Sequence, residues 1–486
     1  MANPLGLFDE ARIGLRSVAD RLEDFAHPTL RLGVTGLARA GKTIFTTALV
    51  HALTNGGRLP VFEAMASGRI AGARLEPQPD DAVARFAVED HLETLARLRA
   101  WPESTSRVSE LRLAVRFATR RGSQRTLTLD LVDYPGEWLL DLPLLDMTYE
   151  EFSRTSLALA RAPGRAPLAQ PLLALLAASA PQGPADETRA RELAAHFKAY
   201  LAACRSERVA MSLLPPGRFL MPGDLEGSPA LTFAPLDLSP GQTPPAGSLA
   251  AMMTRRFEAY KSAVVRPFFR EHFARLDRQI VLVDTLAALN AGPAALADLE
   301  RALDSILLAF RIGRNTLLSS LLRPRIEKVL FAATKADHLH HTSHDRLEAI
   351  LRRLVERAYG RAQQGGAQID VVALAAIRAT READITTGGA RIPAIIGTPE
   401  AGQSAGGRTF DGTEEVALFP GELPSNPYAL FTEDAAGFRG LATGSDAEAD
   451  FRFLRFRPPA DIGVNAPLPH IRLDRALQFL LGDRLG

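Results

Sequence analysis

A glycine-rich segment near the start of the chain has the residue types and spacing needed to hold phosphate groups. Residues 36–43 read G-L-A-R-A-G-K-T and match the pattern G-x-x-x-x-G-K-[ST]. Glycines let the backbone curl so that successive N–H groups face inward, where an anion can sit. Lys42 supplies a full positive charge for the outer phosphates, and Thr43 offers a hydroxyl to Mg²⁺, which prefers oxygen ligands. The predicted phosphate contacts are Gly36, Leu37, Ala38, Arg39, Ala40, Gly41, Lys42, Thr43 and Ile44.

Arg39 inside this loop has two interpretations. It is either an arginine supplied in cis to the charge of a reacting phosphate, or a side chain that folds back and braces the loop. We favour the bracing interpretation.

A second motif supplies a carboxylate at the end of an apolar strand. Residues 126–132 are mostly apolar, and Asp133 follows them, with Gly136 three positions later in a D-x-x-G pattern. An acid at this place holds Mg²⁺ in P-loop proteins, and the glycine N–H contacts the terminal phosphate in GTPases. The same D-Y-P-G sequence is also a good β-turn signal. Because it follows a P-loop, we favour the metal-site interpretation.

Glu137 occupies the position where many small GTPases carry a glutamine that orients the attacking water. A carboxylate there either orients water or forms a structural ion pair with one of the many arginines. The departure from glutamine predicts slow intrinsic hydrolysis.

A hydroxyl from a loop before the strand at 111–117 is expected to complete the Mg²⁺ shell. Thr105 and Ser106 are the candidates, and we favour Thr105. The predicted metal ligands are therefore Thr43, Asp133 and Thr105, and the predicted catalytic groups are Lys42, Glu137, Gly136 and Thr105.

A third motif indicates which base is bound. Thr334, Lys335 and Asp337 follow an apolar strand as T-K-x-D, which matches the guanine signature [NT]-K-x-D. A carboxylate accepts two hydrogen bonds from the N1–H and 2-amino groups of guanine, and adenine has no such edge. The lysine stem would cover the ring. Ala376 and Ile377, after the strand at 371–374, are expected to contact the base as well.

Two other features leave alternatives open. Asp284 ends another apolar strand and is a second candidate for the metal-binding acid. Four histidines fall within residues 338–344, and the i, i+4 spacing of His340 and His344 suits a metal site on a helix. No cysteine is near, so we favour a polar loop beside the base.

The elements that must position these residues alternate between strand and helix. Strands are expected at 32–35, 111–117, 126–132, 280–283, 329–333 and 371–374. Alternating strands and helices predict an α/β fold of the P-loop NTPase (GTPase-like) type, with a mostly parallel sheet. The second and third strands form a predicted antiparallel hairpin.

Composition shifts divide the chain into predicted units. Residues 1–28 form an amphipathic helix that covers the core or a partner helix. The P-loop core occupies 29–137 and 277–380, and an Ala-, Leu- and Arg-rich helical insertion occupies 138–276. Residues 381–486 form a small β-rich unit with a terminal helix.

The bulk properties exclude several classes of protein. The formal charge is +1 over 486 residues, so nothing indicates nucleic-acid binding. The single cysteine, Cys204, rules out an intramolecular disulfide. No signal peptide opens the chain, and the apolar run at 171–180 is too short to span a bilayer. We expect a cytoplasmic protein, with peripheral contact at the inner membrane left open and the oligomeric state unknown.

The chain resembles the YcjX family of bacterial P-loop proteins. The segments that carry the resemblance are GLARAGKT, LVDYPGEW, VLVDTLAALNAGP, TKADH and PHIRLDRALQFLLGD. The resemblance implies a GTPase-like core that binds GTP or GDP with Mg²⁺, a link to stress responses, and a membrane-protein partner similar to YcjF.

Three hypotheses follow. The first is a GTPase that acts as a nucleotide-dependent switch. The second is a nucleotide-stabilised binding protein with negligible turnover. The third is an ATPase of the P-loop class, in which T-K-A-D is incidental.

Overall fold

The computed structural model describes residues 29–486 except 38, 104–106, 207, 310–325, 358, 361–366, 388–389, 406, 433–452 and 464–465. The predicted helix at 1–28 and the predicted site residues Ala38 and Thr105 lie outside the described residues.

The centre of the molecule is an eight-stranded sheet with the order β2-β4-β5-β1-β6-β7-β8, and β3 pairs with β4. The strands from β5 to β8 in this order run parallel, whereas β4 pairs antiparallel with both β2 and β5. This arrangement confirms the α/β fold with a mostly parallel sheet. The strands are β1 Thr29–Gly36, β2 Ile70–Glu76, β3 Ala84–Arg85, β4 Ser109–Ala118, β5 Gln124–Asp133, β6 Arg278–Val283, β7 Lys328–Ala333 and β8 Gln368–Ala373.

The inner strands β6 and β7 begin with polar residues and continue as apolar runs, because both faces of the sheet are covered there. Every residue of β6 is buried. Ile280 and Leu282 belong to the core cluster on one face, and Val281 and Val283 belong to the cluster on the other. Such continuous apolar runs are typical of parallel strands between two helical layers.

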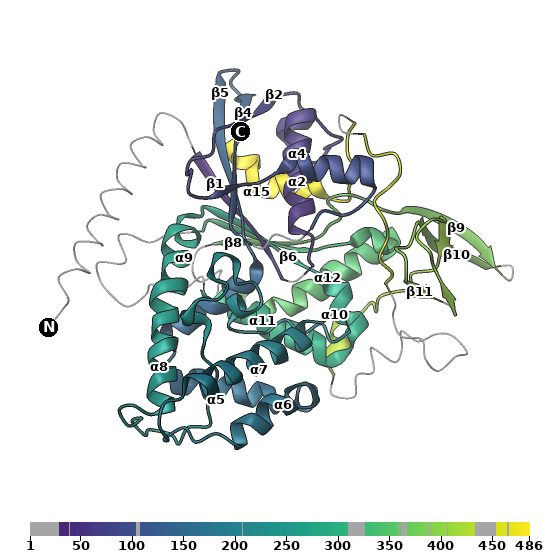
Figure 1. The fold of residues 1–486 in the computed structure, drawn as a ribbon. Helices are drawn as coiled ribbons and strands as arrows, with labels where there is room; N and C mark the ends of the chain where they lie inside the picture. The colour runs from purple at the N-terminus through teal and green to yellow at the C-terminus, as the bar shows by residue number, and fades with distance from the viewer. Residues whose placement is uncertain are drawn as a thin grey trace.

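One face of the sheet is covered by helices from opposite ends of the chain. The last helix, α15, packs on the same core as α2 (Figure 1). Arg278 of β6 is fully buried and its Nη2 lies 2.6 Å from Oδ2 of Asp483, just beyond α15, which fixes this end of the chain to the sheet. The elements on this side are α2 Lys42–Asn55, α3 Glu63–Ala66, α4 Val88–Glu93 and α15 Leu473–Leu481.

The other face carries the larger helical layer. Its helices gather on one side of the sheet (Figure 1) around an aromatic core in which Phe152 and Phe257 stack with ring centroids 4.9 Å apart. The helices are α5 Tyr149–Ala160, α6 Ala166–Ala177, α7 Glu187–Arg205, α8 Leu249–Tyr260, α9 Arg266–Glu271, α10 Thr285–Ala291, α11 Pro293–Ala309 and α12 His344–Leu354. A long 3₁₀ segment, η2 Gly136–Asp146, leads from β5 into this layer.

A β-rich part follows the central sheet in sequence and lies to its side (Figure 1). Three of its strands form an antiparallel sheet with the order β13-β10-β9, and β11 pairs with β12. This confirms the β-rich C-terminal part. The strands are β9 Arg381–Thr387, β10 Ala390–Gly397, β11 Ser404–Ala405, β12 Arg408–Thr409 and β13 Val416–Leu418.

The six predicted strands are all present, and the predicted hairpin is β4–β5. The sequence did not indicate β2, which is mostly exposed or half-buried and therefore lacks an apolar pattern. Between β3 and β4 the chain forms the short helix α4 and a π-helical turn at Thr94–Leu98. Within the described ranges, no helix combines the length and apolar character needed to cross a membrane.

Candidate functional site

The P-loop sits between the central strand β1 and helix α2. Arg39 and Gly41 have left-handed backbones, with φ of 58° and 81°, so the chain curls tightly before the helix begins at Lys42. Glycine adopts this conformation without steric cost. The side chain of Lys42 is buried, and its Nζ donates a hydrogen bond to the carbonyl of Gly36 at 2.9 Å. The loop therefore has the shape that the motif predicts.

A cavity of about 240 Å³ lies beside this loop. Its walls combine the P-loop with the segment after β7 and the segment after β8, which are far apart in sequence. The predicted site residues that line it are Arg39, Ala40, Gly41, Lys42, Thr43, Ile44, Thr334, Lys335, Asp337, Ala376 and Ile377. The fold thus brings the P-loop and the T-K-x-D motif, which the sequence predicts to bind phosphate and base, to a single space, which we call the nucleotide cavity after that prediction.

Asp337 is held firmly in the wall of this cavity. It is only 4 % exposed, and its Oδ2 accepts a hydrogen bond from the N–H of Ala379 at 2.8 Å. The hydroxyl of Thr380 donates to the carbonyl of Asp337. Burial lowers the pKa of the adjacent His338 below its usual value, so this imidazole stays neutral at pH 7. A fixed carboxylate in a buried wall is the arrangement needed to select a base by its edge.

Asp284 and Asp133, the two candidates for the metal-binding acid, lie at the ends of different strands. Oδ2 of Asp284 lies 2.5 Å from Nζ of Lys335, and Oδ1 accepts from the N–H of Ala287 at the start of α10. Asp133 is buried at the end of β5 and pairs in register with Val34, two residues before the P-loop starts. The position of Asp133 favours the predicted metal role, whereas Asp284 caps a helix and pairs with a lysine.

The D-x-x-G glycine lies directly on the P-loop. A Cβ added at Gly136 would be 2.2 Å from the carbonyl oxygen of Gly36, well inside van der Waals contact. A Cβ at Gly36 would in turn be 2.7 Å from the carbonyl oxygen of Leu282. The first glycine of the P-loop and the glycine of D-x-x-G therefore pack backbone against backbone.

Glu137 forms an ion pair with the helical layer. Its Oε1 lies 2.6 Å from Nη2 of Arg205, the last residue of α7, and Glu137 is itself buried. A Cβ at Gly217 would be 2.0 Å from the carbonyl oxygen of Glu137, and Nε1 of Trp138 donates to the carbonyl of Met221 at 3.0 Å. Arg205, Gly217 and Met221 thus hold the segment after Gly136.

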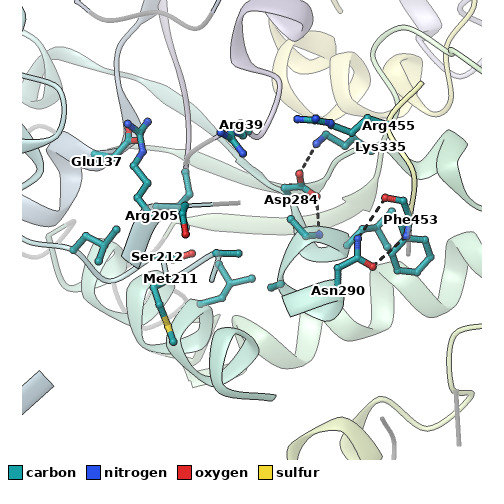
Figure 2. A pocket seen from close by; sticks show the side chains of 18 of the residues that line it. Arg39, Glu137, Arg205, Met211, Ser212, Asp284, Asn290, Lys335, Phe453 and Arg455 are labelled. Carbon is teal, nitrogen blue, oxygen red and sulfur yellow. Dashed lines mark hydrogen bonds and ion pairs between the residues drawn. The ribbon is translucent and has the colours of Figure 1, made fainter. Parts of the chain in front are cut away.

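A second, smaller cavity of about 120 Å³ also lies beside the P-loop and shares Arg39, Lys335, His338 and Arg455 with the first. Glu137 and Arg205 lie at one end of it, Asp284, Lys335 and Arg455 lie at the other, and Arg39 lies between them (Figure 2). Leu37 and Glu137 of the predicted set line this cavity rather than the nucleotide cavity.

The histidines at 338–344 do not gather as their spacing suggests. His344 is buried and its Nε2 lies 3.3 Å from the carbonyl of Leu339. In the part of the chain that the structure describes, the group of possible metal ligands contains His340 and His341 together with Glu382, and not His344.

Comparison with known proteins identifies the family. The model of the YcjX-like family, DUF463, matches residues 30–485, which span the sheet, both helical layers and the β-rich part. The chain belongs to the YcjX-like family. It is 39% identical to "Ras-like GTPase YcjX" of Escherichia coli (strain K12) over 472 residues, covering 94% of this chain and 96% of the relative. It is 33% identical to "Ras-like GTPase YcjX" of Shewanella oneidensis (strain MR-1) over 513 residues, covering 99% and 100%.

This YcjX-like chain also has cavity residues that no motif indicates. Trp101, Glu400, Arg455 and Phe456 line the nucleotide cavity together with the motif residues. Nε1 of Trp101 donates to the carbonyl of Phe456 at 2.7 Å, which joins the segment before β4 to a segment near the C-terminus. The aromatic and charged side chains in these segments were the only available signal, and the sequence contains many similar residues.

Proposed function

We propose that the chain binds guanine nucleotides in the nucleotide cavity and hydrolyses GTP to GDP slowly. One observation carries the proposal: the P-loop residues Gly41, Lys42 and Thr43 share a single cavity with Lys335 and Asp337. A triphosphate at the P-loop would place its base toward the buried carboxylate. The name of the two relatives, Ras-like GTPase, points in the same direction.

The residues around the P-loop fit Mg²⁺. Thr43 and Asp133 offer a hydroxyl and a carboxylate, which are the oxygen donors that Mg²⁺ prefers. Oγ1 of Thr43 lies 3.4 Å from the carbonyl of Glu103, so the segment that leads to the predicted ligand Thr105 approaches the same place. When bound there, Mg²⁺ would neutralise charge on the outer phosphates. Lys42 and the loop N–H groups would orient the phosphates.

A binding protein with negligible turnover is a second candidate, and one observation favours it. Glu137 lies at the position of the water-orienting residue, and its carboxylate forms an ion pair with Arg205. A carboxylate in an ion pair is not positioned to orient water unless the pair opens. We therefore propose that hydrolysis is slow and that Glu137 is mainly structural in this state.

The family resemblance alone supports two further elements of the proposal: a link to a stress response and a membrane-protein partner similar to YcjF. The role of a nucleotide-dependent switch and a cytoplasmic location, with peripheral contact at the inner membrane left open, are proposed from the sequence. The division of the chain into a core, an insertion at 138–276 and a unit at 381–486 also stays a prediction.

Calorimetry tests the binding proposal. GTP, GDP and ATP are titrated in parallel, with Mg²⁺, into the wild-type chain and into Lys42→Ala. We expect GTP and GDP to bind at least about 100-fold more tightly than ATP, because the base edge is matched by a buried carboxylate. Lys42→Ala should bind none of the three nucleotides. Equal affinity for ATP would make the ATPase hypothesis the leading one, and a single-turnover assay of phosphate release would then separate enzyme from binding protein.

A further inference from the structure

His340, His341 and Glu382 bring three metal-ligand atoms together beside the nucleotide cavity. A ring nitrogen from each histidine and a carboxylate oxygen of Glu382 all lie within 4.8 Å of one another. We propose that these three residues bind a divalent transition-metal ion of the Zn²⁺ class. Two imidazoles and one carboxylate suit Zn²⁺, which would take water as its fourth ligand. Metal binding at this site does not depend on the proposed nucleotide function.

The two histidines are placed differently, in a way that suits a site open to solvent on one side. His340 is only 8 % exposed, and its Nδ1 lies 3.1 Å from Oγ1 of Thr342. A contact of this kind fixes the ring of a metal ligand. The side chain of His341 is 64% exposed, so it can turn to close the site. The two rings already lie with their centroids 4.2 Å apart and tilted by 41°.

Glu382 presents its carboxylate to the histidines from a different element. It is the second residue of β9, and its side chain is 25% exposed. Oε2 lies 2.7 Å from Nδ1 of His341, while Oε1 lies 3.5 Å from Nη2 of Arg378. Nε of Arg378 also donates to the carbonyl of Thr380 at 2.8 Å, so the backbone two residues further on holds this arginine. Oε2 of Glu382 thus faces His341, and a bound ion would replace the hydrogen bond between these two atoms.

The site would cross-link the two segments that hold Asp337. His340 lies three residues after Asp337. Glu382 lies two residues after Thr380, whose hydroxyl donates to the carbonyl of Asp337, and Ala379 donates to the Asp337 carboxylate. An ion bound to both segments would stiffen the base-reading wall and so favour nucleotide binding. This coupling, unlike metal binding itself, rests on the proposed function.

Zn²⁺ titration calorimetry tests the site. The full chain, without any polyhistidine tag or nucleotide and with excess Mg²⁺, should bind one Zn²⁺. Co²⁺ bound in place of Zn²⁺ should show the visible absorption bands of a four-coordinate ion with nitrogen and oxygen ligands. His341→Ala and Glu382→Gln should each weaken Zn²⁺ binding at least about 10-fold. His196→Ala serves as the control, because His196 is also exposed but lies on α7 outside the cluster. Absence of binding, or equal affinity in all three variants and the wild type, would overturn the proposal.

A GDP titration with and without Zn²⁺ tests the coupling. We expect GDP affinity to rise about 5-fold with Zn²⁺ in the wild type and to stay constant in Glu382→Gln. If Zn²⁺ binds and GDP affinity does not change, the coupling is rejected and the metal site stands. If GDP does not bind at all, the proposed function fails, and the Zn²⁺ titration still decides the metal site.

Discussion

The backbone of Gly136 rests on the backbone of Gly36, so closely that a Cβ on Gly136 would lie 2.2 Å from the Gly36 carbonyl oxygen. Gly36 begins the P-loop, and Gly136 is the glycine of D-x-x-G. A displacement of either segment must therefore displace the other or open a gap between them. This contact gives a direct mechanical link between the P-loop and the segment that continues into the helical layer through η2.

Gly136→Ala should disrupt this contact. The added methyl group meets backbone atoms, which cannot move aside as a flexible side chain can, and overpacking of this kind costs about 1–3 kcal/mol of unfolding free energy. We expect GDP affinity to fall at least about 10-fold, because the P-loop must shift. Chemical denaturation measures the unfolding free energy, and calorimetry measures the GDP affinity. Gly57→Ala is the control, since a Cβ there meets the Leu59 side chain at 3.6 Å, an ordinary contact. Wild-type GDP affinity in Gly136→Ala would contradict the account.

Glu137 and Arg205 should be energetically coupled. Glu137 is 5% exposed and Arg205 27% exposed in their ion pair. A double-mutant cycle of Glu137→Gln and Arg205→Ala, measured by chemical denaturation, should give an interaction energy of about 1 kcal/mol or more. The exposed pair Arg97–Glu93 is the comparison and should give less than about 0.5 kcal/mol. Equal coupling energies for the two pairs would show that the contact with α7 does not hold the segment.

Glu137→Gln also tests the chemical role of this residue. If Glu137 is mainly structural, the variant should bind GTP as the wild type does and should hydrolyse it at a rate within about 10-fold of the wild-type rate. A loss of about 100-fold or more in single-turnover hydrolysis would instead place the Glu137 carboxylate in the reaction.

The two tryptophans should report different events. Trp101 lines the nucleotide cavity, whereas Trp138 follows D-x-x-G and packs under Arg218, whose guanidinium carbon lies 3.1 Å from the ring centre. We expect GDP to change the fluorescence of the wild type and of Trp138→Phe, but not of Trp101→Phe. Unchanged fluorescence of Trp138→Phe, whose remaining tryptophan is Trp101, on addition of saturating GDP would mean that nucleotide does not enter this cavity.

Asp141 should make stability depend on pH. Burial raises the pKa of this carboxyl from its ordinary 3.8 to about 6, against the hydrogen bonds from Tyr260 and the Gly217 N–H. The folded state therefore holds the proton more tightly than the unfolded state does. Stability from this group is present at low pH and is lost as pH rises from about 4 to about 6, by at most about 1.4 kcal/mol per pH unit.

Asp141→Asn removes this titration. The unfolding free energy of the variant relative to the wild type should increase between pH 4.5 and pH 7, as measured by urea denaturation at each pH. Asp146→Asn, at an exposed position five residues away, is the control for removal of a charge. A constant difference between Asp141→Asn and wild type across this range would contradict the assignment.

The sequence was sufficient to predict the parts of the fold that depend on local patterns. Apolar runs predicted β6 and β7. The P-loop pattern predicted the junction of β1 and α2, because residues a few positions apart determine the backbone geometry there. The edge strand β2 was not predicted, since it is largely exposed and takes its conformation from pairing with β4.

Long-range partners of the site were beyond prediction for a different reason. Arg205 and Arg455 reach the two cavities from segments about 70 and 320 residues after Asp133, and nothing local marks them among 57 basic residues. The ion pair of Glu137 was one of two alternatives that the sequence left open. Its partner, Arg205, lies on α7 and is brought to Glu137 by the packing of the helical layer. The same holds for Glu382, which meets His341 across 41 positions.

The most direct test of the central claim exchanges the base together with the residue that reads it. Asp337→Asn presents an amide, whose NH₂ can donate to the 2-oxo group of xanthine but meets the 2-amino group of guanine donor to donor. Calorimetry of GDP and XDP with both proteins should show that the wild type prefers GDP and that Asp337→Asn prefers XDP, each by about 10-fold or more. Because the variant gains a ligand, misfolding cannot produce this result. If Asp337→Asn keeps its preference for GDP, or shows the same affinity for both nucleotides as the wild type, Asp337 does not read the base and the guanine assignment is wrong.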